Sequence, residues 1–114
     1  MTFINSAAND NIKRWRKISE HPRGAKKIGT TLAEGIHLAE VICQKRPLTR
    51  AVVVRENNVQ SDVLALAERV AEATGAKLLT VTDKLYDAVC PVENGTGIMM
   101  EVAATFADRP VQPI

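Results

Sequence analysis

The chain has 114 residues, of which 46% are apolar and 25% charged, as is ordinary for one globular domain that buries its own core. It has no apolar run long enough to cross a bilayer and no hydrophobic signal core, so we expect a cytoplasmic protein without a membrane partner. The two cysteines, Cys43 and Cys90, exclude a disulfide framework. We interpret them as reduced, although the sequence leaves a disulfide between them open.

The charge is unevenly distributed. Residues 1–27 carry +5 and the remainder carries −3, which gives the formal net charge of +2. A cationic arm on an acidic body favours an anionic partner that binds through one region. Such an arm can neutralise phosphates, and the alternative is a solvated face that only aids solubility. The cations of this arm are Lys13, Arg14, Arg16, Lys17, Arg23, Lys26 and Lys27.

The N-terminal region predicts one amphipathic helix. Residues 1–8 show no periodicity, and a helix capped by Asn9 or Asp10 follows to about residue 20. Helical spacing groups three apolar side chains on one face and four cations on the opposite face. The apolar set is Ile12, Trp15 and Ile18, and the cationic set is Lys13, Arg14, Arg16 and Lys17.

The rest of the chain alternates strands and helices. Strands are predicted at 28–33, 51–54, 78–81 and 98–103, and helices from about 35 to 46, from 61 to 75 and over 83–89. This alternation predicts an α/β fold, a three-layer α/β/α sandwich with a mostly parallel sheet. We expect one domain over residues 1–106, and the proline-containing segment 107–114 as the start of a linker or a free end.

No catalytic constellation stands out. The glycines of 95–97 precede a strand rather than opening a helix, so they predict a turn and no nucleotide cradle. Glu34 and His37 are three apart and could share a helix face, but no third ligand or nucleophile is near in the sequence. Glu34 is as well explained by acceptance of backbone N–H bonds at a helix start. We therefore predict no catalytic, metal-binding or cofactor-binding residue.

Four segments resemble the N-terminal substrate-binding domain of SpoU-type (TrmH-like) RNA 2′-O-ribose methyltransferases. The resemblance runs from about Asn5 to Val102, and at 92–97 the chain departs from the Thr-Glu-Asn-Pro-Gln-Gly usual in that family. The segments are the basic helix 11–18, the basic loop 23–27, Leu32-Ala33-Glu34-Gly35-Ile36-His37-Leu38-Ala39-Glu40, and 85–98 with Glu93-Asn94 and Gly97-Ile98.

This resemblance implies a fold similar to ribosomal and kink-turn RNA-binding proteins, and recognition of structured rRNA or tRNA. It adds Glu34, His37, Asn94 and Thr96 to the cationic arm as RNA-binding residues. It also implies that methyl transfer, S-adenosylmethionine binding and any homodimerisation belong to a knotted C-terminal domain absent from this chain. The fragment alone would then be inactive.

Three alternatives stay open. One is a protein-interaction or dimerisation module, which the acidic body and apolar residues such as Met99 and Met100 near the last strand suggest. Another is a standalone RNA-binding protein. The third is a small enzyme built around Glu34, His37 or Cys90.

Overall fold

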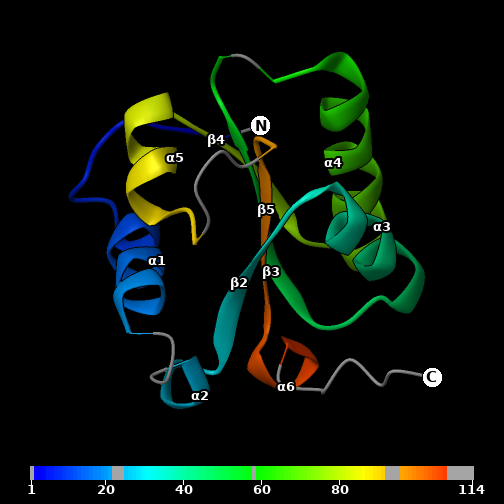
Figure 1. Ribbon diagram of the computed structural model, residues 1–114, viewed down its shortest axis with the longest axis horizontal. Helices are drawn as coiled ribbons and strands as arrows, with labels where there is room; N and C mark the ends of the chain where they lie inside the picture. The colour runs from blue at the N-terminus through cyan, green and yellow to red at the C-terminus, as the bar shows by residue number, and fades with distance from the viewer. Residues whose placement is uncertain (1, 22–24, 58, 92–95, 108–114) are drawn as a thin grey trace.

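A five-stranded mixed sheet forms the centre of the computed structural model, which describes residues 2–21, 25–57, 59–91 and 96–107, with the backbone alone at 25, 26 and 107 (Figure 1). The strand order is β1-β4-β3-β5-β2. β1, β4 and β3 pair in parallel, whereas β5 is antiparallel to both of its neighbours. Four strands therefore point the same way. The strands are β1 (Thr2–Ile4), β2 (Thr30–Glu34), β3 (Thr49–Arg55), β4 (Lys77–Val81) and β5 (Ile98–Ala103).

Helices cover both faces of this sheet, which confirms the predicted three-layer fold. α1 and α5 lie on one face and α3 and α4 on the other, as Figure 1 shows. The short α2 and α6 lie near the end of the sheet where β2 begins. The helices are α1 (Asp10–Glu20), α2 (Ala25–Ile28), α3 (Ile36–Lys45), α4 (Ser61–Thr74), α5 (Asp83–Val89) and α6 (Ala104–Ala107).

The central strands are buried on both faces, as their continuous apolar sequences predict. In β3, Ala51 and Val53 pack against α1 and α5, whereas Val52 and Val54 pack against α3 and α4. Met99 packs on the α1/α5 side and Met100 on the α3/α4 side, and both are fully buried, so they do not support the alternative of an interaction module.

The N-terminal third differs most from prediction. β1 was missed because three residues, two of them exposed, show no periodicity, and only its pairing with β4 makes it a strand. The predicted strand 28–33 begins at Thr30 instead, because Ile28 ends α2 and Gly29 follows with φ +95°. The basic loop 23–27 is thus partly helical.

Candidate functional site

The basic helix α1 is fixed to the domain along one side. Asn9 caps it, since its side chain accepts a hydrogen bond from the Asn11 backbone N–H at 2.8 Å. The apolar set Ile12, Trp15 and Ile18 is buried against the sheet and α5, as predicted. The side chains left exposed on this helix include Lys13, Arg16 and Lys17.

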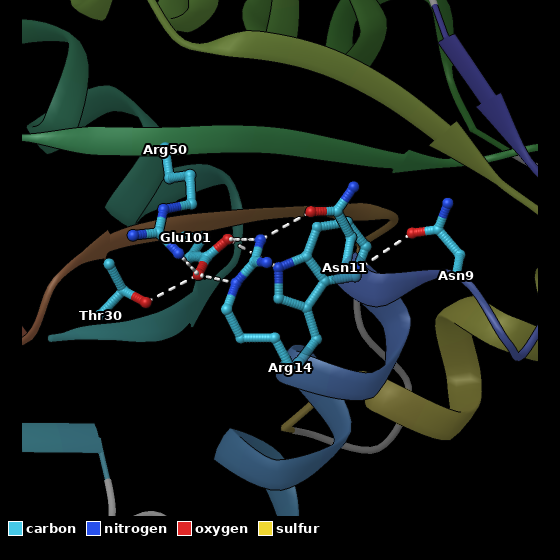
Figure 2. A network of polar contacts seen from close by, with 7 residues as sticks. Asn9, Asn11, Arg14, Thr30, Arg50 and Glu101 are labelled. Carbon is cyan, nitrogen blue, oxygen red and sulfur yellow. Dashed lines mark hydrogen bonds and ion pairs between the residues drawn. The ribbon is translucent and has the colours of Figure 1, made fainter. Parts of the chain in front are cut away.

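Arg14 does not belong to that solvent-facing set, so its predicted position was wrong. Its guanidinium binds both carboxylate oxygens of Glu101 on β5, with Nε and Nη2 each at 2.7 Å (Figure 2). Nη2 also donates to the Asn11 side chain at 2.7 Å. Arg14 is therefore drawn inward by a carboxylate 87 residues away in the sequence, which helical periodicity cannot reveal.

Glu101 is an ionised carboxylate with no exposed surface. Besides Arg14, it accepts hydrogen bonds from Trp15 Nε1 at 2.8 Å and from Thr30 Oγ1 at 2.7 Å. Burial raises the pKa of this carboxyl, but the hydrogen bonds from Arg14, Thr30 and Trp15 outweigh it and hold the pKa below its usual value. This network joins α1, β2 and β5 at one point.

The remaining cations of the arm lie on α2 or before it. The Lys27 side chain is exposed at the end of α2, close to the start of β2. Arg23 and the side chain of Lys26 lie outside the described residues.

The second group of predicted residues lies where β2 ends. Glu34 is the last residue of β2, and its carboxylate accepts hydrogen bonds from the Thr96 backbone N–H at 2.6 Å and the Thr96 hydroxyl at 3.4 Å. Gly35, with φ +117°, separates it from the first turn of α3, where His37 is exposed. Glu34 and His37 therefore do not share a helix face, so the alternative of a general-base or metal pair on one face is not formed. Asn94 lies outside the described residues.

Lys27 and the Glu34–Thr96 pair lie at opposite ends of the sheet. Thr30, next to α2, pairs with Ala103, whereas Glu34 pairs with Met99 at the other end of the same ladder. The four residue steps from Thr30 to Glu34 span about 14 Å. The structure brings Glu34 and Thr96 together, and it separates both from Lys27.

An ion-pair cluster that the sequence did not signal lies beside Glu34 and Thr96. Arg55, at the end of β3, pairs with Asp83 at 3.2 Å and Asp87 at 3.1 Å, and its guanidinium lies 5.3 Å from the centre of the Tyr86 ring. The hydrogen bond from the Asn57 backbone N–H, followed by those from Arg55 and the Asn57 side chain, lowers the pKa of Asp83 despite some desolvation. Burial raises the pKa of the Tyr86 hydroxyl, which keeps it neutral.

Arg55 of this cluster also packs closely against Gly97. A Cβ at Gly97 would lie 3.4 Å from the Arg55 side chain and 3.6 Å from Val59, and the Gly97 carbonyl accepts the Arg55 backbone N–H. The glycine, with φ +93°, allows Arg55 to pack closely against it, and it leads into β5 rather than into a helix.

Cys43 and Cys90 are both half-buried and form no disulfide with each other. Cys43 packs with the α3/α4 side of the core and Cys90 with the α1/α5 side, so the sheet separates them. In the part of the chain that the structure describes, no three His, Cys, Asp or Glu residues cluster as a metal site would require, and no helix is long and apolar enough to cross a membrane.

The α/β/α architecture is shared with known RNA-modifying enzymes. The chain is similar to the AdoMet-bound rRNA methyltransferase from Sinorhizobium meliloti, with a TM-score of 0.69 and 17% identity over 90% of this chain and 36% of that one. It is also similar to an RNA 2′-O ribose methyltransferase, with a TM-score of 0.70 and 18% identity over 99% of this chain and 41% of that one. The chain thus spans about two fifths of the length of these enzymes. No curated protein sequence matches it significantly.

The family is shown by the sequence itself. Residues 9–100 match the model of the MRM3-like substrate binding domain, and the chain belongs to this family. The match begins at the cap of α1 and ends within β5, so it includes α1 and both ends of the sheet.

Proposed function

We propose that this chain is the RNA substrate-binding domain of a cytoplasmic RNA 2′-O-ribose methyltransferase and that it binds structured rRNA or tRNA. The observation that carries the proposal is α1 itself. Lys13, Arg16 and Lys17 are exposed on a helix whose other side is fixed by a buried tryptophan and a buried ion pair. Fixed cations bind phosphates at a smaller entropic cost than cations on a flexible arm.

The other predicted residues extend this interface. Lys27 lies on the short helix after α1, and we include Arg23 and Lys26 of the same segment. Glu34, His37, Asn94 and Thr96 would form a second contact area, where the hydrogen bond between Glu34 and Thr96 joins β2 to the segment before β5. An RNA that contacts both areas must extend along the sheet.

In this proposal, methyl transfer takes place in another domain of the enzyme. Gly97 leads into β5 rather than into a helix, and the chain spans about two fifths of the length of the similar enzymes. The cofactor and the methyl-transfer step are therefore assigned to a further domain, such as the portion of the similar enzymes that this chain does not cover. The chain contributes RNA binding and orientation.

The test is RNA affinity measured by fluorescence anisotropy with labelled tRNA and rRNA fragments across a salt series. We expect Lys13→Gln/Lys17→Gln to weaken binding about tenfold at moderate salt and to reduce the slope of log K against log salt by about 2, because two phosphate contacts are removed. The matched control is Lys45→Gln/Arg69→Gln, which removes two exposed cations from α3 and α4 on the opposite face. Equal affinity of the two variants would contradict the proposal.

A protein-docking role is the second candidate. Two large apolar side chains in the first turn of α3 are exposed, Ile36 by 36% and Leu38 by 38%. Sedimentation equilibrium distinguishes the candidates, because a concentration-dependent dimer without RNA affinity would favour docking.

A further inference from the structure

An irregularity in β3 places Arg50 on an unexpected face of the sheet. Thr49 lies opposite Val102 and Ala51 lies opposite Glu101, so two steps along β3 match one step along β5 and Arg50 is the extra residue. Strict alternation would place Arg50 with Val52 and Val54 on the α3/α4 face. A β-bulge re-aims such a side chain. The Arg50 guanidinium instead lies 3.7 Å from the Glu101 carboxylate, on the α1 face (Figure 2).

Glu101 has no lone pair left to accept a hydrogen bond from Arg50. A carboxylate offers about four lone-pair sites, and Glu101 already receives two hydrogen bonds from Arg14 and one each from Trp15 and Thr30. At 3.7 Å, Arg50 forms an ion pair but no hydrogen bond with it, and 52% of the Arg50 side chain is exposed. One negative charge is thus shared by two arginines, which leaves a net positive charge and guanidinium donors facing solvent.

Lys77 extends this positive region across the sheet. It pairs in register with Ala51, which in turn lies opposite Glu101. Every second residue of a strand faces the same side of the sheet, so Lys77 shares a face with Leu79 and Val81. These two side chains pack on the α1/α5 side, which is also the face of Glu101. Its side chain is exposed at the start of β4.

These residues continue the exposed cations of α1. Lys17 follows Arg14 by one helical turn on the same side of α1, and Arg14 meets Arg50 at Glu101. Within α1 itself, the exposed carboxylate of Glu20 lies 3.8 Å from Arg16 and is paired with it. A row of positive charge therefore runs from α1 onto the sheet.

We infer that Arg50 and Lys77, here called the sheet cations, bind phosphates of the same RNA as α1. The inference rests on the proposed function and adds two contact residues from separate strands. Pairing along the strands places Arg50 beside the Arg14–Glu101 pair, and Lys77 on the same face of the sheet two strands from Glu101. The guanidinium fork of Arg50 suits bidentate phosphate binding, whereas Lys77 acts as a point charge.

The test compares the RNA affinity of Arg50→Gln/Lys77→Gln with that of the wild-type chain and of the control Lys45→Gln/Arg69→Gln, on the same labelled tRNA and rRNA fragments. We expect Arg50→Gln/Lys77→Gln to bind RNA about tenfold more weakly and to reduce the slope of log K against log salt by about 2. The control variant should change little in either quantity. Arg50→Lys should lose less affinity than Arg50→Gln because it keeps the charge, and less than full affinity should remain because it lacks the bidentate fork.

Stability and function can be separated in this experiment. Trp15 fluorescence in urea checks folding, and if Arg50→Gln unfolds the chain, Lys77→Gln alone is expected to lose about threefold or more with a slope change of about 1. If the α1 variant weakens binding and the sheet variants match the control, the inference is overturned while the proposed function stands. If the wild-type chain binds no RNA, both are overturned.

Discussion

At the residue scale, Glu101 decides how α1 is held. A carboxylate without exposed surface is costly to bury unless its charge is paired and its lone pairs are filled. Here Arg14 supplies the charge, and Trp15 and Thr30 supply the remaining hydrogen bonds. The same residue thus gives the basic helix its fixed position and explains why Arg14 is not free on the surface.

Replacing this carboxylate is expected to destabilise the domain strongly. Glu101→Gln keeps the size of the side chain but removes its charge. Its amide NH2 group is a donor, so it cannot accept the hydrogen bonds that Arg14, Thr30 and Trp15 donate to the carboxylate. We expect a loss of about 3 kcal/mol in the free energy of unfolding, the scale for breaking a buried ion pair. Urea unfolding followed by Trp15 fluorescence measures it. Glu68→Gln on the exposed side of α4 is the control, expected to change stability by less than about 0.5 kcal/mol.

The pKa of Glu101 makes this contribution pH-dependent. Since its pKa is lower in the folded chain than in the unfolded chain, the contribution is fully present above the unfolded value, about 4.3, and is lost as pH falls through the folded value. We expect the difference in unfolding free energy between wild type and Glu101→Gln to be constant from pH 7 to 5 and to shrink below about pH 4. A difference that stays constant down to pH 3 would contradict the assigned role.

At the scale of elements, the junction between β2 and α3 depends on one glycine. Gly35 has φ +117° and ψ 157°, a conformation that is essentially restricted to glycine. Its backbone N–H donates to the Ile98 carbonyl and its own carbonyl accepts the Ala39 N–H, so it links β5 to the first turn of α3. The turn places Glu34 at Thr96 and His37 on the helix.

Substitution at Gly35 is expected to be costly for backbone reasons alone. A Cβ there would meet nothing within 4 Å, so Gly35→Asn should destabilise by about 1–3 kcal/mol through strain rather than collision. Gly75→Asn is the matched control, because φ +75° and ψ 10° lie in the left-handed region that asparagine tolerates. Equal unfolding free energies of the two variants would argue against this explanation.

At the scale of the whole molecule, the C-terminal boundary can be tested by truncation. Phe106 in α6 packs against the α3/α4 core, and α6 contacts β2 and β5. We expect residues 1–107 to melt within about 2 °C of the full chain, and residues 1–103 to melt several degrees lower, since about 1 kcal/mol shifts Tm by 4–8 °C in a domain of this size. Calorimetry measures both, and equal melting of all three chains would show that α6 adds no stability.

The sequence alone determined much of this protein. It predicted the buried face of α1, the bounds of α5 and β5 and the two-sided burial of β3, because these depend on local capping, periodicity and composition. The family was identified from motifs that resemble it, and the family model matches residues 9–100. Only the tertiary structure decided that β1 is a strand, that Arg14 turns inward to Glu101, and that Glu34 and Lys27 lie at opposite ends of the sheet. It also brought Arg50 to the Arg14–Glu101 pair and placed Lys77 on the same face of the sheet. Each of these depends on a partner distant in the chain, chosen by strand pairing, a bulge or the cost of an unpaired buried charge, and no local pattern encodes that choice.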